Sequence, residues 1–125
     1  MNFVVLNNQL IDQNDVKLSV KNRGFSYGDG FFESIKIFNK KPFNFENHFN
    51  RIEVSANYLD LKFKLSHDHL LDMILTLLER NKITNGAVRI SVFRDSLGKY
   101  CPDQNTSSIY IISNEDEISS FSKKS

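Results

Sequence analysis

The sequence is poor in the residues that mark specialised classes of protein. It has one cysteine, Cys101, no tryptophan and two prolines among 125 residues. A single cysteine excludes a disulfide framework within the chain, which is typical of a reducing compartment. Residues 1–7 lack the basic and apolar regions of a signal peptide, and no run approaches the roughly 20 apolar residues that a membrane helix needs. We expect a cytoplasmic protein with no membrane partner.

A dominant charge of either sign is also missing. The formal net charge is +1 at pH 7, from 16 basic and 15 acidic residues, so we expect no nucleic-acid partner. What is present, 40% hydrophobic residues and eleven phenylalanines, is typical of one globular domain. A chain of this length buries roughly two-thirds of its surface on folding, and we expect most of the phenylalanines in the core.

The spacing of apolar residues predicts an α+β domain. Alternation is typical of strands, and a period near 3.6 is typical of helices. The predicted strands cover residues 3–6, 9–11, 31–38, 87–94 and 108–113, and the predicted helices cover residues 45–59 and 66–81. Asn44 and Ser66 are the expected N-caps. Short connections favour a mainly antiparallel sheet. We place the domain at residues 1–113 and interpret the charged residues 114–125 as a tail or the start of an interdomain linker.

Glycines are concentrated just before the strand at residues 31–38. Gly24, Gly28 and Gly30 fall within seven residues. Glycine lets the backbone adopt positive φ or come close to a ligand. The segment is therefore either a tight turn or one wall of a binding site.

One face of the first predicted helix carries His48, Arg51 and Ser55. Their spacings of three and four residues make them neighbours on the helix surface. A guanidinium beside a hydroxyl and an imidazole can hold a phosphate, because guanidinium matches it bidentately and stays charged. The alternative is a solvated face with local ion pairs, to Glu46 or Glu53.

The strand at residues 87–94 carries two arginines on opposite faces, Arg89 and Arg94. An arginine at an alternating apolar position is costly unless it is paired. Either side chain could bind a carboxylate, and exposure on the sheet surface is the alternative.

The sequence predicts no metal centre and no cysteine nucleophile. His67 and His69 are two residues apart on a predicted helix, so their rings point in different directions and no third ligand stands nearby. Cys101 has no histidine and orienting group suggested by the sequence.

Taken in order, these motifs resemble the class IV aminotransferase family. This is the pyridoxal-phosphate group that includes branched-chain aminotransferases, D-amino acid aminotransferases and aminodeoxychorismate lyase. The residues that carry the resemblance are Arg23-Gly24-x-x-Tyr27-Gly28-Asp29-Gly30-x-Phe32-Glu33-Ser34, then Lys41-Pro42-Phe43, then His48-x-x-Arg51-x-x-x-Ser55-Ala56. The resemblance extends to about residue 113 and implies the small N-terminal domain of such an enzyme.

The resemblance also implies roles for individual residues. Arg51 is similar to the helix arginine that contacts the phosphate of pyridoxal phosphate. Tyr27 and Phe32 resemble the pair that lines the substrate side of the pocket, and Arg89 stands near a strand position that faces the site. Lys99 lies in a loop that resembles one binding the substrate carboxylate, often across a dimer interface. Arg51 should then point into the same concavity as Tyr27 and Phe32.

Two departures from the family pattern limit what the resemblance implies. Lys99 and Cys101 stand where some D-amino acid enzymes carry arginine and histidine. The lysine that the family links to its cofactor lies in a second, larger domain, and no lysine of this chain matches it. We therefore expect the chain alone to have no aminotransferase activity and to bind pyridoxal phosphate weakly.

Three hypotheses about function follow from the sequence. The first is the small domain of a homodimeric enzyme that performs transamination, or a related lyase step, on an amino acid or keto acid. The second is a stand-alone, non-catalytic domain of the same origin that dimerises or binds a partner. The third is an unrelated α+β domain with a chance glycine loop. The substrate and its stereochemistry do not follow from the sequence.

Overall fold

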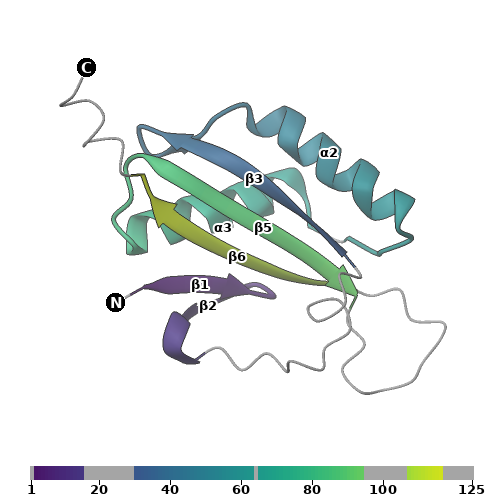
Figure 1. Ribbon diagram of the computed structural model, residues 1–125, viewed down its shortest axis with the longest axis horizontal. Coiled ribbons are helices and arrows are strands. Elements are labelled where there is room, and N and C mark those ends of the chain that lie inside the picture. The colour runs from purple at the N-terminus through teal and green to yellow at the C-terminus, as the bar shows by residue number, and fades with distance from the viewer. Residues whose placement is uncertain (1, 16–29, 64, 95–106, 117–125) are drawn as a thin grey trace.

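One antiparallel sheet organises the fold in the computed structural model, which describes residues 2–15, 30–63, 65–94 and 107–116 (Figure 1). Within these ranges the strands are β1 (Phe3–Leu6), β2 (Gln9–Asp12), β3 (Gly30–Phe38), β4 (Lys41–Pro42), β5 (Gly86–Arg94) and β6 (Ser107–Glu115). Their order across the sheet is β2-β1-β6-β5-β3-β4, and every neighbouring pair is antiparallel. The predicted α+β class and mainly antiparallel sheet are confirmed.

Two helices cover one face of this sheet. Helix α2 spans Phe45–Tyr58 and helix α3 spans His67–Arg80, with a short 3-10 helix, η1, at Gln13–Asp15. Helix α2 lies alongside β3, and α3 passes behind β5 and β6 (Figure 1). In the described ranges no helix has both the length and the apolar character needed to cross a membrane.

The hydrophobic core lies between the helices and the sheet. Strand β3 shows why, because its residues alternate between buried and exposed from Phe32 to Phe38, as the period of two predicts. The core residues are Val5, Ile35, Ile37, Phe45, Phe49, Ile52, Ala56, Leu61, Leu70, Met73, Ile74, Leu77, Leu78, Ile83, Val88, Ile90, Val92, Ile109 and Ile111. The apolar stripes predicted for both helices therefore face the sheet.

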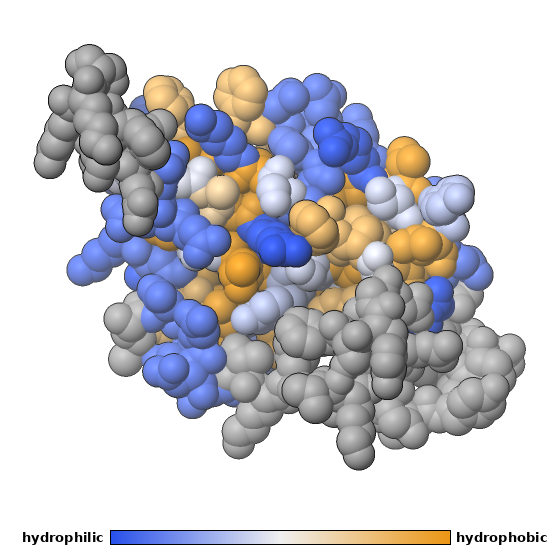
Figure 2. All heavy atoms as spheres, viewed as in Figure 1, coloured by the Kyte–Doolittle hydropathy of each residue, from blue (hydrophilic) through white to orange (hydrophobic). Residues whose placement is uncertain are grey.

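The other face of the sheet has no helix over it in the described part of the chain. Hydrophobic and hydrophilic side chains are interspersed on this face, which Figure 2 shows. Phe32 and Phe38 stand on it with 56% and 64% of their surface exposed. Of the nine described phenylalanines, Phe45, Phe49 and Phe93 are buried. Phe3, Phe31 and Phe63 are partly buried and pack against the core, so core packing is confirmed for most of these nine.

The end of β6 differs by two residues from the sequence prediction. Strand β6 continues to Glu115, two residues past the expected end at Ser113, because Asn114 and Glu115 pair with the first residues of β5. Both residues are exposed, so their polar side chains stay in water and the strand is extended at little cost. The predicted tail otherwise lies mostly outside the described residues.

The two predicted N-caps behave differently. Ser66 caps α3 as predicted, because its hydroxyl accepts a hydrogen bond of 3.1 Å from the backbone N–H of His69. Asn44 precedes α2, but its side chain does not cap the helix. Asn44 has φ of 61°, in the left-handed region that asparagine tolerates, and its Oδ1 accepts from the side chain of Asn47 at 3.0 Å.

Candidate functional site

The glycine before β3 is required by the sheet itself. Gly30 pairs with Phe93 of β5, and a Cβ at Gly30 would lie 2.3 Å from the carbonyl oxygen of Val92. Real Cβ atoms do not approach backbone so closely, so a side chain at this position would push the strands apart. At Gly30 the close approach is therefore to β5 and not to a ligand. Gly24 and Gly28 lie outside the described residues.

A buried carboxylate next to this strand end holds two side chains of α2. The alternation of β3 turns Glu33 toward the helices, where it is 8% exposed. Its Oε2 lies 2.5 Å from Nδ1 of His48 and 3.4 Å from Nε of Arg51. A buried carboxylate without such partners would be strongly destabilising. We call Glu33, His48 and Arg51 the carboxylate cluster.

The guanidinium of Arg51 is directed outward from this cluster. Its side chain is 70% exposed, and Nε is the atom that meets Glu33. The two terminal Nη groups make no contact in the described part of the chain, so they can both donate to an anion. Neither predicted local partner, Glu46 or Glu53, pairs with Arg51, and the alternative of local ion pairs is wrong in that detail.

The predicted substrate residues of the strands lie together on the open face of the sheet. The guanidinium carbon of Arg89 stands 3.9 Å from the ring centroid of Phe32, in a cation–π contact. Arg89 has no acidic partner among the described residues. The register places Ser91 opposite both Phe32 and Tyr110, so two residues that carry hydroxyl groups lie on the same face of the sheet as Arg89. We call Phe32, Arg89, Ser91 and Tyr110 the open-face cluster.

The hydroxyl of Tyr110 is a neutral donor in this cluster. Burial raises the pKa of Tyr110 above its usual value of 10.0, because the charged phenolate is disfavoured away from water. A protonated tyrosine on the same sheet face as a guanidinium that has no acidic partner among the described residues can donate a hydrogen bond to a carboxylate. The open-face cluster therefore has the chemistry of a carboxylate-binding surface.

Arg51 and Phe32 lie on opposite sides of β3. Phe32 and Glu33 are adjacent on this strand, so their side chains leave it on opposite faces, and Arg51 follows Glu33 to the helix side. The two clusters therefore flank one strand, whose edge beside Gly30–Ser34 has no strand partner within the described ranges because β4 pairs only with Ile37 and Phe38. A concavity shared by Arg51, Phe32 and Tyr27 stays a prediction, because Tyr27 lies outside the described residues.

Several predicted residues are used elsewhere or cannot be placed. Arg94, on the opposite face from Arg89, donates to the carbonyl oxygen of Leu59 at 3.0 Å. Ser55 makes no side-chain contact with Arg51 in the described ranges. Tyr27 and Lys99 lie outside the described residues, as does Cys101.

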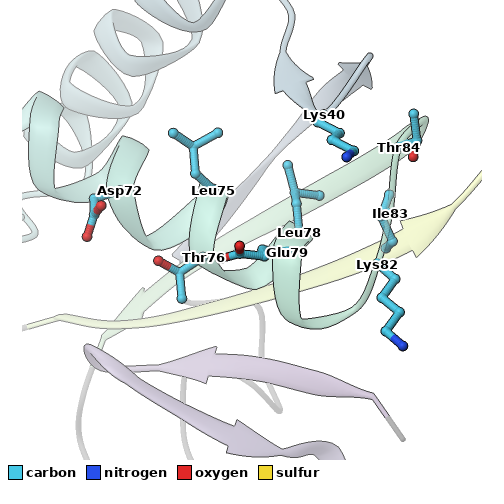
Figure 3. Close-up of a pocket in the computed structure, with 9 residues that line it drawn as sticks. All are labelled: Lys40, Asp72, Leu75, Thr76, Leu78, Glu79, Lys82, Ile83 and Thr84. Atoms are coloured by element: carbon cyan, nitrogen blue, oxygen red, sulfur yellow. The ribbon is translucent and has the colours of Figure 1, made fainter.

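A separate pocket opens beyond the other end of β3. It has a volume of about 570 Å³ and lies between α3, the turn after β3 and the segment that leads into β5 (Figure 3). Its lining residues are Lys40, Asp72, Leu75, Thr76, Leu78, Glu79, Lys82, Ile83 and Thr84. None of the predicted site residues belongs to it, and Lys82 points away from the pocket in Figure 3. It is therefore distinct from both clusters.

The histidines of α3 do not converge on a common point. His67 contacts Glu46 and Asp68, whereas Nε2 of His69 lies 3.3 Å from Oδ1 of Asn8. Among the residues that the structure describes, no group of three or more histidine, cysteine, aspartate or glutamate side chains could hold a metal ion.

Comparison with solved structures defines the class of fold. The branched-chain amino acid aminotransferase of Escherichia coli superimposes with a TM-score of 0.81 over 92% of this chain and 40% of its own, at 21% identity. A second branched-chain amino acid aminotransferase, from T.th. and solved with pyridoxamine 5′-phosphate, gives a TM-score of 0.81 at 20% identity, over 92% of this chain and 40% of that one. At these identities the likeness shows the fold alone, a small aminotransferase-type α+β domain.

Sequence comparison shows the family. The family model for amino-transferase class IV matches residues 30–125. The D-alanine aminotransferase of Staphylococcus haemolyticus is 36% identical over 94 residues, which cover 75% of this chain and 33% of that enzyme. A D-alanine aminotransferase of Listeria monocytogenes is 32% identical over 91 residues, covering 73% and 32% of the two chains. The chain belongs to the class IV aminotransferase family, and it spans about a third of the length of these relatives.

Family membership removes the hypothesis of an unrelated domain. The family assignment rests on these matches and does not depend on how Arg51 and Phe32 are placed. The sequence analysis missed Glu33 as a site residue. The period of β3 placed it on the helix side, and a charged residue at a core-facing strand position is itself a signal that a partner is required.

Proposed function

We propose that this chain is the part of a pyridoxal-phosphate-dependent aminotransferase that binds the cofactor phosphate and the substrate carboxylate. The observation that carries the proposal is the exposed Arg51 guanidinium, whose Nε meets buried Glu33 while both Nη groups lack a hydrogen bond or ion pair among the described residues. Two parallel N–H donors match two phosphate oxygens. The family membership and the structural neighbour solved with pyridoxamine 5′-phosphate support this choice of ligand.

Each cluster has its own part in this proposal. Arg51 binds the phosphate, and Arg89 with the hydroxyl groups on the same sheet face orients the carboxylate of an amino acid or keto acid. Phe32 covers one side of the Arg89 guanidinium and limits its contact with water. Pyridoxal phosphate, when bound, supplies the electron sink through which an amino group is transferred. The lysine to which the family links the cofactor is expected in a second domain.

The first test is the binding of a phosphorylated ligand by this chain. Pyridoxamine 5′-phosphate has no aldehyde and cannot react with lysines, so its binding reports non-covalent recognition. We expect it to bind more tightly than pyridoxamine in a titration followed by ligand and protein NMR. Arg51→Ala should weaken its binding by about 10- to 100-fold, which is the usual worth of a charge-assisted, bidentate contact.

Arg80→Ala is the matched control for this test. It also removes one helix arginine, but the Arg80 guanidinium lies over the ring of Phe3, away from both clusters. Its affinity for pyridoxamine 5′-phosphate should equal that of the unaltered chain. Equal binding of pyridoxamine and its phosphate, or an unchanged affinity in Arg51→Ala, would contradict the proposed function.

A second candidate function is supported by the exposed aromatic residues. Phe32 and Phe38 stand more than half exposed on the open face of the sheet, and such residues commonly mark a protein interface. In this alternative the chain dimerises, or binds a partner, without taking part in catalysis. A cytoplasmic location and a homodimer remain predictions.

A further inference from the structure

The contact between Glu33 and Arg51 has a specific chemical consequence. It uses Nε, the donor nearest the aliphatic stem, at 3.4 Å from the carboxylate. A contact at Nε directs the flat end of the guanidinium away from Glu33, so both Nη groups face outward together. A contact through one Nη would instead occupy one of the two terminal donors, and the guanidinium could no longer offer both Nη groups to a phosphate. We propose that Glu33 is a positioning residue that holds Arg51 in its phosphate-binding orientation.

An exposed arginine gains more from a positioning contact than a buried arginine does. With 70% of its side chain exposed, Arg51 would sample many rotamers, and binding a ligand would have to restrict all of them. Glu33 is almost completely buried and sits within a paired strand, so its carboxylate is a fixed reference point. Holding Nε against it restricts the arginine before the ligand arrives.

His48 completes the arrangement from the helix side. Its ring is 18% exposed, and its Nδ1 lies 2.5 Å from the same Oε2 that faces Arg51. His48 and Arg51 are about one helical turn apart, so two side chains of the same helix contact the Glu33 carboxylate. His48 therefore fixes the rotation of the carboxylate, and the carboxylate fixes the guanidinium.

The charge of Glu33 and its proposed positioning role predict opposite changes in phosphate affinity when Glu33 is replaced. By charge alone, a carboxylate close to an anion site repels a phosphate, so removing it should tighten phosphate binding. By position, removing or shortening the carboxylate frees Arg51 and should weaken binding. The sign of the change in affinity therefore separates the two effects. This inference rests on the proposed function, because it assumes that Arg51 binds phosphate.

The experiment compares three variants with the unaltered chain in titrations with pyridoxamine 5′-phosphate. Glu33→Gln removes the charge, and Glu33→Asp keeps the charge but shortens the reach by one methylene. Both should weaken binding by a few-fold, which is what an ion pair to a largely exposed side chain contributes. Glu53→Gln removes an equal charge from an exposed position on α2, and its affinity should be unchanged.

A second measurement needs no change at Glu33. The Nε–Hε group of Arg51 should give a resolved, slowly exchanging signal in the ¹⁵N NMR spectrum of the unaltered chain, because its ion pair with buried Glu33 holds it beside a carboxylate. Arg51→Lys identifies this signal by its absence. If Arg51 gives no protected Nε–Hε signal, the proposal is wrong, whatever the folding of the Glu33 variants.

The outcomes separate this proposal from the proposed function. Weaker binding in Arg51→Ala together with tighter or unchanged binding in Glu33→Gln and Glu33→Asp would overturn the positioning role and leave the phosphate site in place. Unchanged binding in Arg51→Ala would remove the phosphate site itself. Weaker binding in Arg51→Ala, Glu33→Gln and Glu33→Asp, unchanged binding in Glu53→Gln and a protected Nε–Hε signal together support both.

Discussion

At the scale of single residues, Asn81 links three elements with one amide group. It follows the last residue of α3, and its Oδ1 accepts from the backbone N–H of Phe3 at 2.7 Å. Its Nδ2 donates to the carbonyl oxygen of Phe3 at 2.9 Å and to the hydroxyl of Ser113 at 2.8 Å. Because Phe3 belongs to β1 and Ser113 to β6, this side chain fixes the end of α3 over two strands.

Replacing Asn81 should destabilise the domain clearly. Asn81→Ala removes three partly buried hydrogen bonds and leaves the backbone of Phe3 unpaired, so we expect a loss of about 2–3 kcal/mol in the free energy of unfolding. Urea unfolding followed by circular dichroism measures it. Asn50→Ala, at an exposed position of α2, is the control and should change stability by less than about 0.5 kcal/mol. An equally small effect at Asn81 would contradict its linking role.

The residue scale also shows what sequence patterns can and cannot predict about the site. The period of β3 correctly separated Phe32 from Glu33, and the helical period correctly placed His48 beside Arg51. The contact between Glu33 and Arg51 depends on how α2 crosses β3, which no local period encodes. The local ion pairs considered for Arg51, to Glu46 and Glu53, were wrong because the nearest carboxylate comes from another element.

At the scale of elements, His67 joins the starts of the two helices. Its ring meets the rings of Phe45 and Phe49 edge-on, with centroids 4.9 and 5.4 Å apart. Nδ1 lies 3.0 Å from Oδ1 of Asp68, and Nε2 lies 3.1 Å from Oε1 of Glu46 without forming a well-directed hydrogen bond. The hydrogen bond to Asp68, supported by the charge of Glu46, raises the pKa of His67 above 6.5 against the effect of its partial burial.

This contact should make the packing of the helices depend on pH. A pKa that is raised in the folded state means that the protonated ring stabilises the fold. The contribution is fully present below pH 6.5 and is lost as the pH rises through the folded-state pKa. The loss of stability in His67→Gln should therefore be larger at about pH 5.5 than at about pH 8.5, in thermal unfolding.

Asp68→Asn is the background that checks the cause of this pH dependence. It removes the carboxylate with the largest effect on His67, so the effect of His67→Gln should vary less with pH in this background. An effect of His67→Gln that is the same at both pH values would show that the ring acts only by packing.

Turns and helix starts were predictable from the sequence where the residue type at that position has one main structural role. Asn7 and Asn8 both have positive φ, as a tight hairpin turn between β1 and β2 requires, and Ser66 caps α3. Asn44 was not predictable in the same way, because asparagine serves equally well as a side-chain cap and as a left-handed residue. Which role it takes depends on the direction in which the chain arrives from β4.

At the scale of the whole molecule, the sheet is asymmetric in what it exposes. One face carries both helices and nearly all of the core. The other face combines polar side chains with the exposed rings of Phe32 and Phe38 (Figure 2). Fold class followed from patterns within the sequence, whereas the order β2-β1-β6-β5-β3-β4 depends on pairing between distant segments. The aromatic residues of the open face looked like core residues because a hydrophobic residue does not reveal which of two sheet faces is covered.

This face is the basis for the last prediction, that the chain self-associates. Burying the exposed phenylalanines of this sheet face against a second surface stabilises the complex, because it removes their rings from water. We expect a homodimer in sedimentation equilibrium and light scattering. Phe38→Lys, at a side chain 64% exposed and outside both clusters, should raise the dimer dissociation constant by about tenfold or more, as expected for a central aromatic residue. Tyr58→Lys, on α2 and 87% exposed, should leave the constant unchanged. A monomer at high protein concentration, or equal effects of the two lysine variants, would mean that the open face is not the interface.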